Sequence, residues 1–222
     1  GENLNSGAFE DYDPQWNIMP RISFSFPISD EAVFFAHYDV LTQRPTGQNI
    51  TNPIDYLFIQ NIGQRAIANP NLRPTRTVDY ELGFQQVLSR TSSLKIAAFY
   101  RETRDEIQVR NLLEAYPVTY NTFDNFDFGT IKGLTLTYDL RRTGNVTLRV
   151  AYTLQFANAT GSNSETALSL VNSGEPNLRV IFPTSRDQRH LLITTFDYRY
   201  GAGADYNGPT IGGKQILANT GL

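Results

Sequence analysis

This chain of 222 residues contains no cysteine, so it has no disulfide framework, no thiolate metal site and no cysteine nucleophile. It also lacks an apolar run of about 18 residues, which excludes a membrane-spanning helix. With a net charge of −3, it has no basic surface that would suit nucleic acid. Its first residues do not resemble a signal peptide. We therefore expect either that one has been removed or that the chain begins partway through a longer protein.

What the sequence does contain is strict alternation of apolar and polar residues, repeated along the chain. Alternation over roughly 9–12 residues predicts a β-strand whose two faces meet different surroundings. No long helical pattern competes with it, and proline and glycine fall mainly between the alternating runs. We therefore predict an all-β fold, an antiparallel up-and-down meander of about 7–8 strands. The alternating runs are residues 21–28, 32–41, 77–88, 93–104, 132–141, 145–157 and 190–200.

The connections between these runs alternate strictly between short and long. Loops above about 12–15 residues are uncommon in compact domains, and a soluble β-sandwich, the alternative fold, would have short loops at both ends. Outer-membrane barrels have tight turns at one end and long loops at the other, and about 9–11 tilted residues span the bilayer. We therefore predict part of a larger transmembrane β-barrel in the bacterial outer membrane. The short turns are 27–31, 89–92, 141–144 and one starting at Gly201, and the long outer loops are 42–76, 105–130 and 158–188.

In such a barrel, one face of each strand meets lipid and the other meets the lumen. We assign the aromatic and aliphatic faces to lipid, because barrels carry aromatic side chains where strands cross the membrane surface. The predicted lipid-facing residues are Phe34, Tyr38, Val78, Tyr80, Leu82, Phe84, Leu94, Ile96, Leu134, Leu136, Tyr138, Leu148, Val150, Tyr152, Phe196 and Tyr198. The predicted lumen-facing residues are His37, Asp39, Asp79, Glu81, Gln85, Lys95, Arg101, Arg149, Gln155, Asp197 and Arg199.

Three short motifs resemble the later barrel strands of a TonB-dependent receptor. The segment Asn69-Pro70-Asn71-Leu72-Arg73-Pro74-Thr75 leads into Tyr80-Glu81-Leu82-Gly83-Phe84. In that family an N-P-x-L-x-P-E stretch leads into a strand reading roughly Y-E-L-G-F, so Thr75 departs from the common Glu. Pro20-Arg21-Ile22-Ser23-Phe24 and Asp187-Gln188-Arg189-His190 also resemble strand entries of the family. The resemblance covers most of the chain, from about residue 20 to residue 200.

This resemblance implies import of a large, scarce nutrient, such as a siderophore, vitamin, glycan or peptide, with energy supplied through TonB. It implies three partners: outer-membrane lipid, an extracellular nutrient ligand, and the TonB system through an N-terminal plug that this sequence does not contain. Plugged transporters of this kind have about 22 strands, and open sheet edges are not tolerated in lipid. We therefore expect a fragment of the barrel cut at both ends. A closed eight-strand barrel is the alternative if the last residues pair with the first.

No catalytic, cofactor or metal site is expected from the sequence. Asp79 and Glu81 would lie about 7 Å apart on one strand face, a spacing that suits glycosidase chemistry. With Lys95 and Arg101 across the hairpin, however, a charge ladder is the favoured interpretation. His37 and His190 have no metal-ligand partner at a suitable spacing. The oxygen-rich loop residues Asn121, Asp124, Asn125 and Asp127 could hold Ca²⁺ but lack the spacing of a known calcium loop.

The long segment 42–76 is rich in amide and aromatic side chains, which suit capture of an oligosaccharide or a chelate and equally suit an inert surface loop. Its candidate ligand residues are Gln48, Asn49, Tyr56, Asn61 and Arg65. Two other functions stay open at this point. The first is a structural or secretion-associated barrel without transport. The second is a barrel enzyme, such as a protease or lipase, which would need a catalytic set that the sequence does not show.

Overall fold

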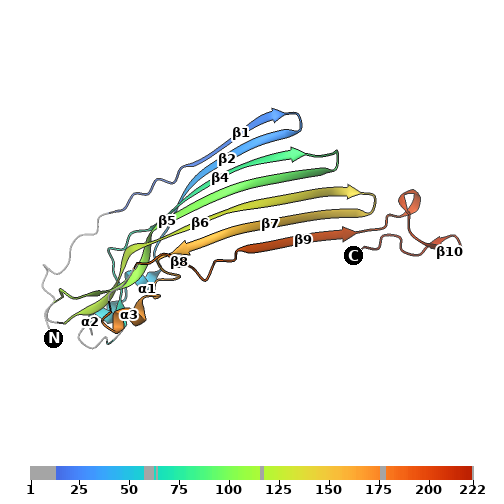
Figure 1. The fold of residues 1–222 in the computed structure, drawn as a ribbon. Helices are drawn as coiled ribbons and strands as arrows, with labels where there is room; N and C mark the ends of the chain where they lie inside the picture. Colours follow the sequence, from blue (N-terminus) through green and yellow to red (C-terminus); the bar gives the residue numbers. More distant parts are fainter. Residues whose placement is uncertain (1–13, 58–62, 64, 116–117, 176–178, 222) are drawn as a thin grey trace.

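The computed structural model describes residues 14–57, 63, 65–115, 118–175 and 179–221 of the chain. They form one long, curved sheet of nine strands and a separate two-stranded hairpin (Figure 1). The long strands pair antiparallel in chain order, which confirms the predicted all-β meander. They are β1 (Arg21–Ser29), β2 (Ala32–Gln43), β4 (Thr75–Val87), β5 (Ser92–Leu112), β6 (Tyr120–Thr143), β7 (Val146–Ala159) and β9 (His190–Tyr198).

The two ends of the sheet differ. The short connections β1–β2, β4–β5 and β6–β7 all lie at one end, which we call the turn end (Figure 1). The opposite end, the loop end, holds the helices and short strands of the long connections (Figure 1). These elements are α1 (Gly47–Ile50), α2 (Pro53–Leu57), β3 (Ala66–Ile67), α3 (Leu168–Asn172) and β8 (Phe182–Pro183).

Strands β5 and β6 continue far beyond the predicted strand ends. The segment 105–130, expected as an irregular loop, is largely a hairpin extension that runs to Leu112 and resumes at Tyr120. The extension follows a break in register between Thr103 and Glu106, where Asp105 has a φ of 58°. Beyond this bulge the two strands carry many asparagine and aspartate residues, such as Asn111, Asn121 and Asp124, which are typical of turns. They favour a loop in the sequence, although the structure pairs them as strands.

The predicted turn at Gly201 is not a tight hairpin. After β9 the chain passes through a 3₁₀ turn at Gly203–Asp205 and a small hairpin of β10 (Thr210–Ile211) and β11 (Lys214–Gln215). It then returns to the sheet, where Arg199 bridges to Gly221. Among the described residues, β1 and β9 lie at opposite sides of the sheet and do not pair, so these residues do not form a closed eight-strand barrel.

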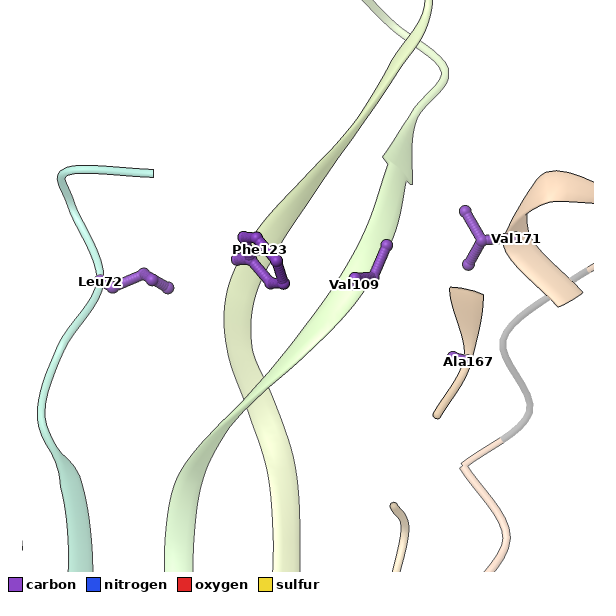
Figure 2. Packing of buried hydrophobic residues seen from close by; sticks show 5 residues of the cluster. All are labelled: Leu72, Val109, Phe123, Ala167 and Val171. Carbon is purple, nitrogen blue, oxygen red and sulfur yellow. The ribbon is translucent and has the colours of Figure 1, made fainter. Parts of the chain in front are cut away.

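The main buried apolar cluster lies at the loop end and not under the sheet. Val109 and Phe123 lie on the hairpin extension, with Leu72 on one side and Ala167 and Val171 on the other (Figure 2). We call this region the loop-end cap: the β5–β6 extension beyond Asp105 together with residues 66–73 and 161–172. It joins three segments that are distant in sequence.

The middle of the sheet has no such covering layer. Leu82 is 56% exposed and Leu134 is 38% exposed, although both are large and apolar. A β-sandwich would bury such side chains against a second sheet, so the exposed face rules out that alternative for the described residues. No helix in the described part of the chain is long and apolar enough to cross a bilayer.

Candidate functional site

The register of the sheet separates side chains by chemistry. Rows of direct partners run across neighbouring strands, so residues in one row share one face. One such row is Phe34, Phe84, Ile96, Leu136, Tyr152 and Leu192, and the row beside it is Ala36, Leu82, Ala98, Leu134 and Leu154. All the predicted lipid-facing residues fall on this side, which we call the apolar face. Which face meets lipid stays a prediction.

The opposite side, the charged face, holds the predicted lumen-facing residues. Asp39, Asp79 and Arg101 form one row of direct partners, and His37 and Glu81 lie in the next. Gln85 and Lys95 are partners on β4 and β5, Arg149 pairs with Asp139 on β6, and Asp197 pairs with Thr147 on β7. Gln155 continues the same alternation on β7, and Arg199 continues it directly after the end of β9.

Cross-strand ion pairs connect the charged face. The Arg101 guanidinium is hydrogen-bonded to the Asp79 carboxylate, and Lys95 Nζ lies 3.5 Å from Glu81 Oε1. Arg21 lies 3.4 Å from Asp39 in the same way. Each carboxylate is therefore matched with a cation, which is the expected charge ladder and not an acid–base pair poised for catalysis. His37 Nδ1 is 2.9 Å from Ser23 Oγ, an ordinary polar contact.

A hollow of about 510 Å³ opens on the charged face at the loop end. Its floor is formed by strand residues including Thr77, Arg101 and Ile131, and its walls come from two long connections. Arg44 and Arg186 bring basic groups to these walls, and hydroxyls and backbone of residues 161–164 line the far side. The lining is mainly polar and carries both signs of charge. It suits a ligand that offers several hydrogen-bonding groups.

Two carboxylates lie beside this hollow. Burial raises the pKa of Glu106 above its usual value, the nearby Asp127 raises it further, and Arg186 opposes the shift. Glu106 lies beyond the length of β5 that would span a bilayer. Asp127 is 4% exposed and accepts a hydrogen bond of 3.0 Å from Gln108 Nε2. The raised pKa means that protonating Glu106 favours the folded cap, and this contribution disappears as the pH rises through that pKa.

The predicted ligand loop is only partly placed at this hollow. Asn49 lines it, whereas Gln48 is exposed on α1. The Arg65 guanidinium lies 3.5 Å from the buried carboxylate of Asp55. Tyr56 belongs to α2, and Asn61 lies outside the described residues. The ligand role of these residues stays a prediction.

The Asn-Pro-Asn-Leu segment has a clear structural role. Asn69 Nδ2 donates to the Phe123 carbonyl at 2.8 Å, and Leu72 is buried in the cap. We call residues 69–73 the strap, and Asn125 holds the strap to the hairpin. Its Oδ1 accepts from the Arg73 amide at 2.6 Å, and its Nδ2 donates to the Arg73 and Asp105 carbonyls at 2.9 and 2.8 Å. The motif therefore fastens the chain entering β4 against the bulge of β5.

The Asp187-Gln188-Arg189-His190 motif anchors the entry to β9. Asp187 Oδ1 accepts from the Ala157 amide at 3.0 Å, and Asp187 Oδ2 accepts from Arg189 Nε at 3.1 Å. These two hydrogen bonds, the one from Ala157 first, lower the pKa of Asp187 below its usual value. His190 Nδ1 lies 2.8 Å from the Tyr152 hydroxyl. The histidine is thus a rim residue with a protein partner.

The oxygen-rich residues considered for Ca²⁺ are used within the protein. Asp124 is paired with Arg110 at 3.1 Å, and Asn121 Oδ1 accepts from Asn111 at 2.7 Å. Asn125 holds the strap described above. Within the described ranges, no cluster of three or more histidine, cysteine or acidic side chains could hold a metal ion. Nothing in this part of the structure therefore supports the calcium alternative.

Sequence reasoning missed Gln108, the central polar residue of the cap. It is 1% exposed, its Nε2 donates to Asp127 and to the Asn163 carbonyl, and its Oε1 accepts from the Val109 and Ala167 amides. Apart from the neighbouring Val109, these partners lie 19 to 59 positions away in the chain, so no local pattern marks Gln108.

Comparison with known proteins identifies the family. Residues 2–220 match the family profile described as TonB dependent receptor-like, beta-barrel. No curated protein sequence gives a significant match.

Solved structures of the same architecture agree in fold. FrpB, an iron transporter from Neisseria meningitidis, aligns over 83% of this chain and 24% of its own, with 15% identity and a TM-score of 0.50. The outer membrane transporter YddB from Escherichia coli aligns over 82% and 26%, with 14% identity and a TM-score of 0.56. The pyoverdine receptor FpvA from Pseudomonas aeruginosa PAO1 aligns over 84% and 23%, with 14% identity and a TM-score of 0.53.

The chain thus spans about a quarter of the length of these structures. At this level of identity they show a shared fold and nothing finer. Three observations indicate the same family. They are the profile match over nearly the whole chain, the two-faced meander, and the contrast between its turn end and its loop end. The family consists of outer-membrane receptors and not of enzymes. This chain belongs to the β-barrel domain of the TonB-dependent receptor-like family, in the bacterial outer membrane.

Proposed function

We propose that the chain is part of the wall of a receptor that imports a large, scarce nutrient across the outer membrane. In this proposal the apolar face meets lipid, the charged face lines the lumen, and the loop end lies outside the cell. The observation that carries it is the register, which gathers aliphatic and aromatic rows on one face and paired charges on the other. Barrels that conduct polar solutes have this arrangement.

The ligand would enter past the loop end and meet the hollow beside Arg101 and Arg186. Its mainly polar walls favour a large ligand rich in oxygen, such as a siderophore, vitamin, glycan or peptide. FrpB is named an iron transporter and FpvA was solved with pyoverdine, which supports the chelate class within this group. The energy would come from TonB through an N-terminal plug of the complete protein. The loop residues Gln48, Asn49, Tyr56, Asn61 and Arg65 would help to capture the ligand.

Deletion strains provide the direct test. The gene for the complete protein is deleted in one strain and tonB in another. Both are grown on a panel of ferric chelates, vitamins, glycans and peptides, each as the sole source of the required nutrient. We expect both strains to lose growth on the same nutrient. Normal growth of the receptor deletion on every nutrient, with the outer membrane weakened, would favour the structural alternative.

The orientation can be tested separately with single cysteines, since this chain has none and any cysteine elsewhere in the complete receptor can first be replaced by serine. In the complete receptor, Gln48→Cys at the loop end and Thr91→Cys at the turn end are labelled on intact cells with a maleimide that does not cross membranes. We expect Gln48→Cys to react and Thr91→Cys to react only after lysis. The reverse pattern would overturn the proposed orientation.

A further inference from the structure

Basic side chains gather on the apolar face near its loop end. Arg76 and Arg104 are direct partners on β4 and β5, and Lys132 follows on β6. The Arg189 guanidinium lies 5.1 Å from the ring centroid of Phe156, a residue of the same face. We call Arg76, Arg104, Lys132 and Arg189 the cationic belt. All four are exposed.

The belt lies directly beside an aromatic row. Tyr38, Tyr80, Tyr100, Lys132 and Phe156 are successive direct partners from β2 to β7. The rings of Tyr38 and Tyr80 are 5.3 Å apart and those of Tyr80 and Tyr100 are 6.3 Å apart. Lys132 therefore stands within a row of aromatic side chains, the type that marks the membrane–water interface.

The distance along the strands agrees with that position. Arg76 is eleven residue steps from Val87 at the turn end of β4, and Lys132 is eleven steps from Thr143 at the turn end of β6. At roughly 3.3 Å per step and a tilt of roughly 45°, each lies about 25 Å from the turn end along the membrane normal. The apolar band of an outer-membrane barrel is about 25 Å tall. Both cations are therefore placed at headgroup depth.

Two members of the belt are neutralised within the protein and two are not. Arg104 Nε lies 2.5 Å from Glu102 Oε1, and Arg189 is paired with Asp187. Arg76 and Lys132 have no ion-pair partner among the residues that the structure describes. On the charged face, by contrast, Lys95 and Arg149 each lie near a carboxylate. The belt keeps an excess of positive charge although the whole chain is negative.

We propose that the cationic belt binds phosphate groups of lipid headgroups in the outer leaflet of the outer membrane. This inference rests on the orientation given in the proposed function. The Arg76 guanidinium suits two phosphate oxygens at once, and the long stem of Lys132 can lie along Tyr100 while its ammonium group reaches the headgroups. Such contacts would fix the depth of the barrel wall in the membrane.

The test measures lipid binding to the complete receptor in phosphatidylcholine nanodiscs. Diphosphoryl lipid A is titrated into discs that carry the wild type, the double variant Arg76→Gln/Lys132→Gln, or the control double variant Lys95→Gln/Arg149→Gln. The control removes the same two residue types from the charged face. Lipid A whose phosphates have been removed serves as the second control. Thermal unfolding without lipid A shows whether each variant is folded.

We expect the belt variant to bind diphosphoryl lipid A roughly tenfold or more weakly than the wild type, because each basic group near a charged membrane surface contributes about fivefold. The wild type should also bind the lipid A without phosphates roughly tenfold or more weakly than diphosphoryl lipid A. Equal binding by the wild type and the belt variant would overturn the proposal but leave the transport function untouched. Weaker binding only in the control variant would show that the charged face meets lipid, which would overturn both.

Discussion

The sheet and the loop-end cap share strands β5 and β6 but differ in how they bury apolar side chains. On β5, Ile96 in the sheet is 36% exposed, whereas Val109 in the cap is fully buried. The first sits on a two-faced ladder that leaves apolar side chains uncovered, and the second lies within a small protein core. A single strand can therefore belong to an uncovered two-faced sheet and to a packed folded unit, with the bulge at Asp105 as the boundary.

The largest difference between the two regions should appear when a buried ring is removed from the cap. Phe123→Ala takes away a side chain that is 6% exposed and should cost about 3–5 kcal/mol of local stability. Hydrogen exchange of amides 107–111 and 121–125 measures it. The matched control is Phe128→Ala on the same strand, because Phe128 is 37% exposed. Equal effects from both variants would argue against a packed cap.

The sheet should be most sensitive to charge on its apolar face. Leu136→Arg near the middle of the apolar rows should cost about 2–4 kcal/mol, the penalty for an arginine facing the bilayer midplane. Unfolding of the complete receptor by denaturant in lipid vesicles measures this free energy. Thr135→Arg, one position along and on the charged face, is the control and should cost much less. If Thr135→Arg were the more damaging change, the assignment of the two faces would be wrong.

The polar centre of the cap should give an intermediate effect. Gln108→Ala leaves the buried Asp127 carboxylate without the Gln108 donor and the Ala167 amide without its acceptor, at a cost of about 1–3 kcal/mol. The loss should appear as faster exchange at residues 161–172 while the sheet amides stay protected. Global loss of protection would contradict the separation of the cap from the sheet.

The smallest effect concerns pH at the entry to β9. Because hydrogen bonds from Ala157 and Arg189 lower the pKa of Asp187, its stabilising effect is complete above the usual carboxyl pKa of about 4. It disappears as the pH falls through the lowered value. We expect the exchange of the Ala157 amide, corrected for its intrinsic rate, to rise on acidification. In Asp187→Asn this pH dependence should be absent. If Asp187→Asn showed the same pH dependence of Ala157 exchange as the wild type, the proposed anchor would be excluded.

Much of the sheet could be predicted from the sequence because its physics is local. Residues such as Tyr80 and Glu81 are neighbours in the chain and meet different surroundings. The alternation of residue types within each strand of the sheet therefore indicates its two faces. The ion pair between Asp79 and Arg101 was also predictable, since one short turn sets the register of β4 and β5 and makes these two residues direct partners. The motif at residues 69–73 indicates the family from the sequence alone, whereas its hydrogen bonds to Phe123 and Asn125 are seen only in the structure.

The cap could not be predicted in this way. The sequence predicts a loop over residues 105–130 because asparagine and aspartate residues such as Asn121, Asp124 and Asn125 are typical of turns, and only the pairing across the hairpin makes this segment two strands. Gln108 gains its role only from Asp127, Asn163 and Ala167, which the sequence places far away. The sequence by itself determined the two-faced strands and their order, because neighbouring residues set both. Only the tertiary structure decided which distant loops close over β5 and β6, because that depends on packing among segments that no short pattern connects.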